Sequence, residues 1–168
     1  YSPEDVSIHR AIINIAHQAN DIERILAEYS HIYDIYYRQG KYEEAADVQR
    51  EAIKIRPVDP SLRTPLIKAL ISAQQTKSAV EELFNLSGIY DDRQQYDQVL
   101  QVCSQILELD PNNFRARRLK AQTFLNLGNN ERALSEFMQI AALIDELEST
   151  KDTCLLYTSP SPQTSLHL

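Results

Sequence analysis

The residues best able to do chemistry in this sequence are a short run of basic side chains. Arg115, Arg118 and Gln122 are spaced so that one face of a helix would carry all three. An arginine side chain presents a fork of donors that fits a carboxylate. The spacing therefore predicts a contact with an anion or an acidic peptide, and the competing interpretation is a solvated helix face balanced by nearby acids. The full run is Arg115, Arg117, Arg118 and Lys120.

Other reactive residue types do not form a recognisable catalytic or metal-binding pattern. His9, His17 and His31 have no cysteine or paired acid at ligand spacing, and no CxxC sequence occurs. Cys103 lies on an apolar stripe, which is typical of a packed thiol. Glycine-rich phosphate loops and Ser/His/Asp spacings are also missing. We therefore expect no metal, no cofactor and no enzymatic activity.

The charge balance narrows the classes of partner. The 168 residues include 17 Lys and Arg against 24 Asp and Glu, which gives a formal net charge of −7. Nucleic acid binding requires clustered basic residues, so it is disfavoured. Apolar runs are too short to span a membrane. Two cysteines without a disulfide pattern favour a reducing, cytoplasmic location, although a chain that starts at Tyr1 leaves its true N-terminus open.

Hydrophobic periodicity predicts an all-α fold of seven or eight helices joined by short links. Ser2 and Pro3 read as the start of the first helix, Asp21 as the cap of the second, and Gly40 as a helix end. Short links force consecutive helices to be antiparallel neighbours. The later helices are expected at 42–55, 61–74, 77–91, about 96–109, about 114–127 and 131–148.

Three blocks of the sequence repeat the same residue types. "YYRQGKYEEAADVQREAIKIRPVD" aligns with "YDDRQQYDQVLQVCSQILELDPNN", so that Tyr36 matches Tyr90. "FLNLGNNERALSEFMQI" places Phe124 on these tyrosines, one full period after Tyr90. The chain thus resembles the tetratricopeptide repeat, a helical hairpin of about 34 residues, over roughly positions 26–147. The resemblance implies antiparallel hairpins stacked as an α-solenoid.

One distance departs from the family's period. Pro57 and Pro111 occupy the same place in the first two blocks but lie 54 positions apart, which is one repeat plus one helix and a turn. We therefore predict an extra helix near 61–74, and a helix at 77–91 that serves two hairpins. An odd helix would exchange the inner and outer layers, so the grooves before 60 and after 76 are predicted to open on different sides.

These signals divide the chain into an N-terminal helix, repeats and a tail. The predicted segments are 1–25, the repeats 26–59, 77–113 and 114–147, the extra helix 60–76, and a disordered tail 148–168. From Cys154 the composition changes, and "CLLYTSPSP" (154–162) resembles a translated sequencing-library adapter. Residues 154–168 are therefore predicted not to be native.

The resemblance also implies a binding surface. Members of the family hold an extended peptide on the concave wall made by the first helix of each repeat. The positions that match this wall are Ala27, Ser30, Asp34 and Arg38, then Glu81, Phe84, Asn85 and Gly88, then Arg115, Arg118, Gln122 and Asn126, and the extra helix would add Thr64, Lys68 and Ser72. Among them, the predicted peptide contacts are Asp34, Arg38, Lys68, Asn85, Arg115, Arg118, Gln122 and Asn126. Ser30 and Asp34 stand where the chaperone-binding members have lysine and asparagine, so that specialisation is rejected.

The family's packing positions contain two departures. Tyr33 occupies a slot that usually holds a small residue, and it is expected to splay its hairpin or to dock on the N-terminal helix. Gln49 and Cys103 fill the aromatic slot of the second helix, which only Phe137 fills as the family does. The cluster of tyrosines between Tyr29 and Tyr42 is predicted to be core, with hydroxyl groups at its rim.

The leading hypothesis is a non-enzymatic scaffold that binds a protein or peptide in a groove, as a fragment of a longer protein. The first alternative is a structural segment that self-associates through the ends of the solenoid. The second alternative, a helical-repeat RNA binder, is disfavoured by the charge.

Overall fold

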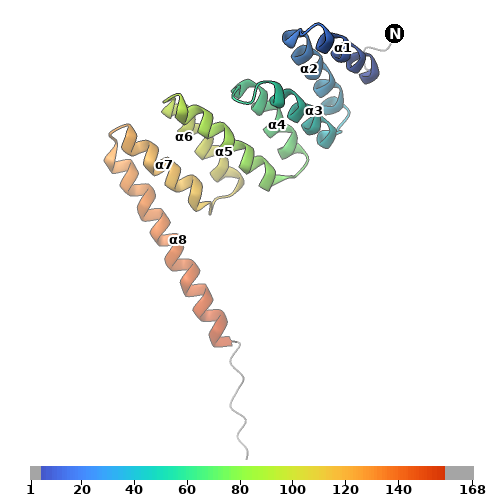
Figure 1. Ribbon diagram of the computed structural model, residues 1–168. Coiled ribbons are helices and arrows are strands. Elements are labelled where there is room, and N and C mark those ends of the chain that lie inside the picture. Colours follow the sequence, from blue (N-terminus) through green and yellow to red (C-terminus); the bar gives the residue numbers. More distant parts are fainter. Residues whose placement is uncertain (1–4, 158–168) are drawn as a thin grey trace, which may run out of the picture. The chain divides into compact units, whose positions relative to one another are not determined.

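A computed structural model describes residues 5–157, with the side chains of residues 5–149, and every regular element in this range is a helix. The chain divides into two compact units at Pro111, an N-terminal and a C-terminal unit. Figure 1 shows the helices in chain order. Their bounds are α1 Val6–Gln18, α2 Ile22–Arg38, α3 Tyr42–Ile55, α4 Pro60–Ser72, α5 Thr76–Asp92, α6 Tyr96–Leu109, α7 Phe114–Asn126 and α8 Asn130–Tyr157. The predicted all-α class and helix number are confirmed over the described range.

Three helices begin at side-chain caps that are evenly spaced along the chain. Asp5 accepts from the Ser7 amide, Asp59 from the Ser61 amide, and Asn113 from the Ala116 amide. Each cap satisfies a backbone donor that the first turn of a helix leaves open. The predicted cap Ser2 and its neighbour Pro3 lie outside the described residues, and α1 begins at Val6 because Asp5 supplies the cap.

Five interhelix turns contain a residue with positive φ. Gly40 and Gly128 have φ of 72° and 73°, where the lack of a Cβ removes the usual strain. Non-glycine residues adopt the same conformation at the other three turns. They are Asn20, Gln74 and Gln94, with φ of 56°, 58° and 56°. Glycine therefore identifies only two of the five turns that contain a residue with positive φ.

The helix bounds repeat with the spacing that separates Pro57 from Pro111. Helices α1, α4 and α7 have 13 residues each and begin at Val6, Pro60 and Phe114. Helices α2 and α5 have 17 residues each, and α3 and α6 have 14 each. We call α1–α3 and α4–α6 the first and second repeats. We call α7–α8 the third repeat, which has two helices within the described residues. The predicted extra helix exists as α4, and it has counterparts in α1 and α7.

Consecutive helices pack on one another throughout the N-terminal unit, as short links require. Across α3, two tyrosines of α2 reach α4: the Tyr33 hydroxyl donates to the Pro65 carbonyl at 3.0 Å, and the Tyr37 and Ser72 hydroxyl oxygens are 2.8 Å apart. The Tyr33 hydroxyl therefore contacts α4, which is neither of the two effects predicted for this residue. This contact forms because α2 and α4 both pack on α3.

The buried residues of the N-terminal unit explain its unusual slots. Tyr29 and Tyr33 are buried, as predicted for a tyrosine core. Buried Gln49 donates from Nε2 to the Leu62 carbonyl at 2.7 Å, which satisfies its amide where the family has an aromatic ring. Pro65 lies inside α4, in its second turn.

The C-terminal unit is the hairpin of α7 and α8. Helix α8 runs for 28 residues to Tyr157, so the predicted tail 148–168 is wrong up to that residue. No proline or glycine occurs between Asn130 and Tyr157, so nothing in that stretch breaks a helix. Residues 158–168, which hold the rest of the predicted tail, lie outside the described range.

Candidate functional site

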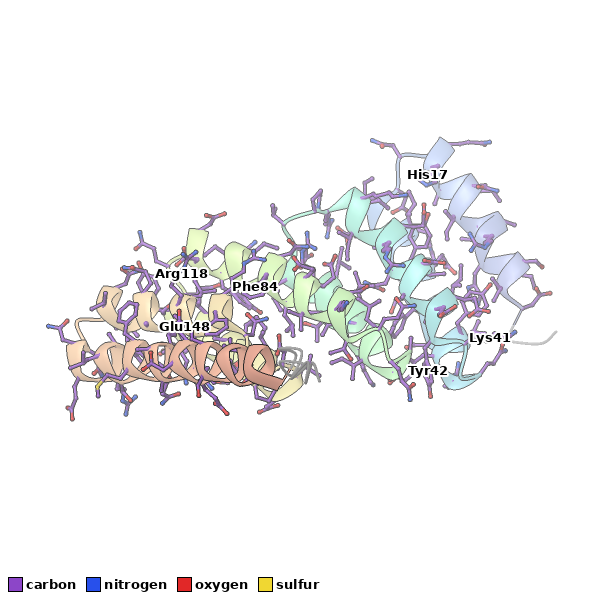
Figure 2. The ribbon with its side chains drawn as sticks, turned by 90° about the horizontal axis from the view of Figure 1, so that it is seen from below. His17, Lys41, Tyr42, Phe84, Arg118 and Glu148 are labelled. Atoms are coloured by element: carbon purple, nitrogen blue, oxygen red, sulfur yellow. The ribbon has the colours of Figure 1, made fainter. Side chains whose placement is uncertain are left out.

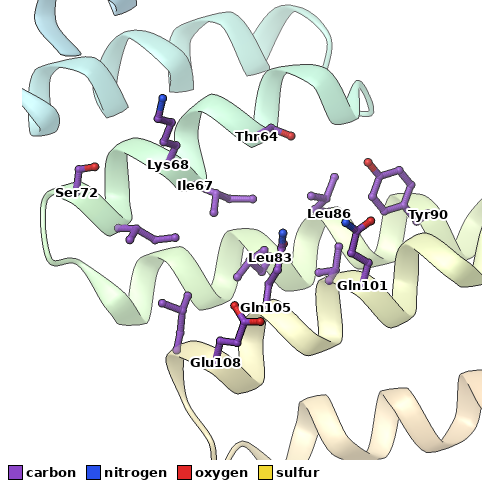
Figure 3. A pocket seen from close by; sticks show the side chains of 13 residues that line it. Thr64, Ile67, Lys68, Ser72, Leu83, Leu86, Tyr90, Gln101, Gln105 and Glu108 are labelled. Atoms are coloured by element: carbon purple, nitrogen blue, oxygen red, sulfur yellow. The ribbon is translucent and has the colours of Figure 1, made fainter. Parts of the chain in front are cut away.

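A groove of the N-terminal unit runs over α5, between α4 and α6. Its volume is about 600 Å³. Buried apolar side chains form its floor, among them Ile67, Leu83 and Leu86 (Figure 3). An apolar floor with a few polar groups at the edge is the usual composition of a ligand-binding cleft.

Helix α4 forms one wall, and a tyrosine of α2 braces it. Thr64, Lys68 and Ser72 lie one turn apart along this wall. The Lys68 ammonium lies 4.6 Å from the centre of the Tyr37 ring, and Ser72 bonds the hydroxyl of the same tyrosine. Figure 3 shows the end of Lys68 directed away from the floor. Tyr37 therefore fixes both polar side chains at the outer edge of the groove.

Helix α6 forms the opposite wall with a different chemistry. Gln101, Gln105 and Glu108 are exposed there at helical spacing, and they face the α4 wall in Figure 3. Glutamine amides both donate and accept hydrogen bonds, so they suit the backbone of an extended peptide. The Glu108 carboxylate accepts only, so it favours a basic group on the ligand.

A second groove, of about 560 Å³, lies on the C-terminal unit between α7 and α8. Arg115 and Arg118 of α7 line it with Ile140, Ile144 and Glu148 of α8, and Figure 2 labels Arg118 and Glu148. Thr64 and Leu86 of the first groove occupy the positions in the second repeat that Arg118 and Ile140 of the second groove occupy in the third repeat. The same structural position is therefore used twice, once edged by Lys68, glutamines and Glu108 and once by two arginines and Glu148.

The predicted basic run is divided between two tasks. Arg117 and Lys120 turn toward the buried carboxylate of Glu136, with nitrogen–oxygen distances of 3.5 and 2.6 Å. Arg115 and Arg118 line the second groove instead. This division follows from the helix period, because positions 115 and 118 share a face that 117 does not.

The other predicted binding residues lie outside both grooves. Gln122 and Asn126 are exposed on α7, and the Gln122 amide donates to the Asn126 side chain at 3.4 Å. Asp34 and Arg38 are exposed on α2, where the Arg38 guanidinium donates to the Asp34 carbonyl. Asn85 is exposed on α5, on a different face from the floor residues Leu83 and Leu86. The structure therefore brings together Arg115 with Arg118, and places Lys68 in a different groove.

Sequence reasoning missed the α6 wall. Gln101, Gln105 and Glu108 were not predicted to bind because α6 matches the second helix of a repeat, which the family places on the outer side. Their signal was the polar side chains at positions 101, 105 and 108, a one-turn spacing opposite the buried stripe. Phe84 shows the opposite error. It matches a wall position, yet it is buried (Figure 2).

Two tyrosines of the core have shifted acidities. Burial raises the pKa of Tyr33 to about 12, with smaller contributions from Tyr37 and Asp34. Burial also raises the pKa of Tyr29. Residues 5–149 contain no group of three potential metal ligands, and no described helix is long and apolar enough to cross a membrane. Both phenols therefore stay protonated at neutral pH.

Comparison with known families agrees with the helical architecture. Tetratricopeptide repeat models match residues 34–59 and residues 92–145. The chain carries tetratricopeptide repeats. The matches cover α3 and α6 entirely, together with the joints at Pro57 and Pro111 from which the repeat was inferred.

A curated relative matches this chain over a small part of its own length. The human protein O-mannosyl-transferase TMTC1 is 27% identical to this chain, over 74% of the chain and 14% of the relative. The chain thus spans about a seventh of the relative's length. The transferase activity in that name is a property of the whole relative.

Two solved structures match most of the chain at low identity. YrrB, described as a TPR protein with an unusual peptide-binding site, is 20% identical with a TM-score of 0.39, over 88% of this chain and 93% of YrrB. MamA from Desulfovibrio magneticus RS-1 is 15% identical with a TM-score of 0.39, over 84% of this chain and 96% of MamA.

Proposed function

We propose that this chain is a non-enzymatic scaffold that binds a segment of another protein in the groove over α5. The groove itself carries the proposal: a buried apolar floor is flanked by Lys68 on one side and by Gln105 and Glu108 on the other. An extended peptide would place alternate apolar side chains on the floor and bond its backbone to the glutamines. Rigid helices on both sides hold these groups in place, so binding requires little reorganisation.

The second groove is proposed to contact an acidic segment. Arg115 and Arg118 line this groove together with Ile140 and Ile144, and a carboxylate bound there would gain a charge-assisted bond. Gln122 and Asn126 lie further along α7, and we propose that they contact the same acidic segment. Asp34, Arg38 and Asn85 remain proposed peptide contacts on α2 and α5, outside the two grooves.

The proposed change of face along the repeats has support in the N-terminal unit. Tyr37 and Ser72 join α2 and α4 across α3, and α4 and α6 together flank the groove over α5. Helices α2, α4 and α6 would then share one layer, with α5 in the other. Tyr36 of α2 and Tyr90 of α5 occupy matching sequence positions, so matching helices would lie in opposite layers.

A peptide selection tests the first groove. The full chain would be immobilised and used to select peptides from a random phage-displayed library, and a selected peptide would be titrated by calorimetry. Ile71→Glu places a charge in the groove at an exposed position and should weaken binding by roughly tenfold or more. Ile15→Glu is the matched control, because Ile15 is also exposed but lies on α1, outside the groove. Equal loss in both variants would contradict the proposed groove.

A charge reversal tests the second groove. Arg115→Glu/Arg118→Glu should abolish binding of acidic peptides selected from the same library. The control is Arg10→Glu/Lys77→Glu, which changes the net charge equally at exposed positions outside both grooves. If both double variants reduce binding alike, the interaction depends on overall charge and not on this groove.

A further inference from the structure

Helix α8 carries an apolar face that its counterpart α5 keeps buried. Leu134, Phe137 and Met138 are 61%, 40% and 64% exposed. The residues at the equivalent positions of the second repeat are Val80, Leu83 and Phe84, which are 8%, 1% and 6% exposed. We call Leu134, Phe137, Met138 and Ala141 the open face of α8. It includes Phe137, which the sequence placed in a packed aromatic slot.

The difference has a simple structural cause. In the second repeat the chain turns at Gln94 and returns as α6, which packs on α5. In the first repeat it turns at Gly40 and returns as α3, which packs on α2. In the third repeat the equivalent residue, Glu148, lies within α8, which continues to Tyr157. Helix α8 is therefore not followed by a returning helix within the described residues.

We propose that the open face of α8 binds an amphipathic helix of the α6 type. In the second repeat of the same chain, α6 packs on α5 and covers the equivalent surface. Helices α3 and α6 bury the same four positions, 45, 48, 49 and 52 in α3 and 99, 102, 103 and 106 in α6. The partner helix is thus defined by small or branched side chains with i, i+3, i+4, i+7 spacing.

The open face has the shape and chemistry for such a helix. A shallow groove of about 430 Å³ lies beside Leu134 and Met138, lined also by Ser135, Gln139 and Ala142. Small residues there allow a helix backbone to approach closely. Leu134 and Met138 lie on a different side of α8 from Ile140, Ile144 and Leu147, which line the second groove, whereas Phe137 shares a side with Ile140 and Ile144. The open face therefore borders the second groove along Phe137, and Leu134 and Met138 are its members farthest from that groove.

The chain's own α6 sequence is the probe. A fluorescein-labelled peptide of residues 94–111 would be titrated into the full chain, and binding would be followed by fluorescence anisotropy. The affinity should be modest because an isolated helix of this length must be ordered on binding. Leu134→Asp/Met138→Asp should weaken binding about tenfold or more. Ile15→Asp/Val58→Asp is the control at two other exposed apolar residues.

A covalent version of the experiment removes the dependence on peptide affinity. A chimera would join residues 1–147 to a second copy of residues 94–111, which restores the register of the turn at Gln94. Hydrogen exchange of the α8 amides should slow, and it should not slow when the attached copy carries aspartate in place of Val102 and Ile106. Equal exchange in both chimeras would overturn the proposal. So would concentration-dependent dimers of the native chain that Leu134→Asp/Met138→Asp abolishes, because a second copy would then cover the face.

Discussion

Arg63 and Glu82 pair across the α4–α5 hairpin, with 2.7 Å between the guanidinium Nη1 and a carboxylate oxygen. The same relationship recurs at the equivalent positions of the first and third repeats. His9 Nδ1 lies 2.6 Å from Glu28, and Arg117 Nη1 lies 3.5 Å from Glu136. A cationic or ionisable donor on the first helix of each repeat thus meets a glutamate on the second, always at the same separation along the chain.

This relationship predicts that Arg63 and Glu82 are energetically coupled. Both side chains are mostly buried, so removing one leaves the other charge poorly solvated. A double-mutant cycle of Arg63→Ala and Glu82→Ala by urea unfolding should give a coupling of about 1–2 kcal/mol. The exposed pair Lys54–Glu51 is the control and should give at most about 0.5 kcal/mol. Equal couplings would mean that burial does not strengthen the pair.

A second prediction concerns the hydroxyl group that joins α2 to α4. Tyr33→Phe removes the bond to the Pro65 carbonyl and should lower the free energy of unfolding by about 1 kcal/mol. Tyr42→Phe, at a half-buried tyrosine of α3, is a control for the loss of a phenol. A larger loss in the Tyr42 variant than in the Tyr33 variant would contradict the assigned role.

The same tyrosine predicts a distinct behaviour in alkali. Burial raises the pKa of Tyr33 to about 12, above the value of 10.0 for an unburied phenol. Its contribution to stability is therefore full below a pH of about 10 and is lost as the pH rises toward about 12. Absorbance at the tyrosinate band should show late titration of Tyr29 and Tyr33, and the step near pH 12 should be missing in Tyr33→Phe. If the late step persists in that variant, another residue causes it.

The cap of α4 gives a prediction at acidic pH. Bonds from Ser61 lower the pKa of Asp59 in the folded state, despite a smaller opposing effect of burial. The charged form thus stabilises the fold above the unfolded pKa, and this contribution is lost as the pH falls through the lowered pKa. Asp59→Ala should cost about 1 kcal/mol at neutral pH, and Asp59→Asn much less, because asparagine also caps. Equal losses in both variants would exclude capping as the cause.

The turns predict a stabilising substitution. Gln94 adopts a φ of 56°, a conformation that Gly40 adopts at the equivalent turn of the first repeat. Gln94→Gly should remove strain and raise the free energy of unfolding by up to about 1 kcal/mol. Gln98→Gly, inside α6, should lower it by about the same amount. Thermal unfolding followed by circular dichroism measures both, and destabilisation by Gln94→Gly would be the contrary result.

Local signals in the sequence located most helices closely. The helix predicted at about 42–55 has the bounds of α3, and the stripe that begins at Tyr96 and stops at Asp110 falls within α6. Each of these stripes ends at a proline joint. The turn at Gly40 was predicted from glycine alone, and positive φ there confirms it. The turns at Gln74 and Gln94 were placed as polar links, but their left-handed conformation has no signal in a glutamine.

The binding surface was less predictable, because exposure depends on which helices meet. Of the predicted contact residues, Lys68, Arg115 and Arg118 line a groove. Asn85 was predicted in the same way but lies outside both grooves. Phe84 and Met138 illustrate the reason, because they occupy equivalent positions and differ in what packs on them. One is buried and the other is 64% exposed.

By itself, the sequence determined the helices and the joints between them, because these depend on residues that are near one another in the chain. It also determined the long spacing between Pro57 and Pro111, which is a distance along the chain. Tertiary structure decided that Tyr33 reaches Pro65, that Gln105 and Glu108 face Lys68 across a groove, and that α8 keeps an open apolar face. These features depend on which helices meet and on what each leaves uncovered, and packing between helices settles that question where helical periodicity cannot.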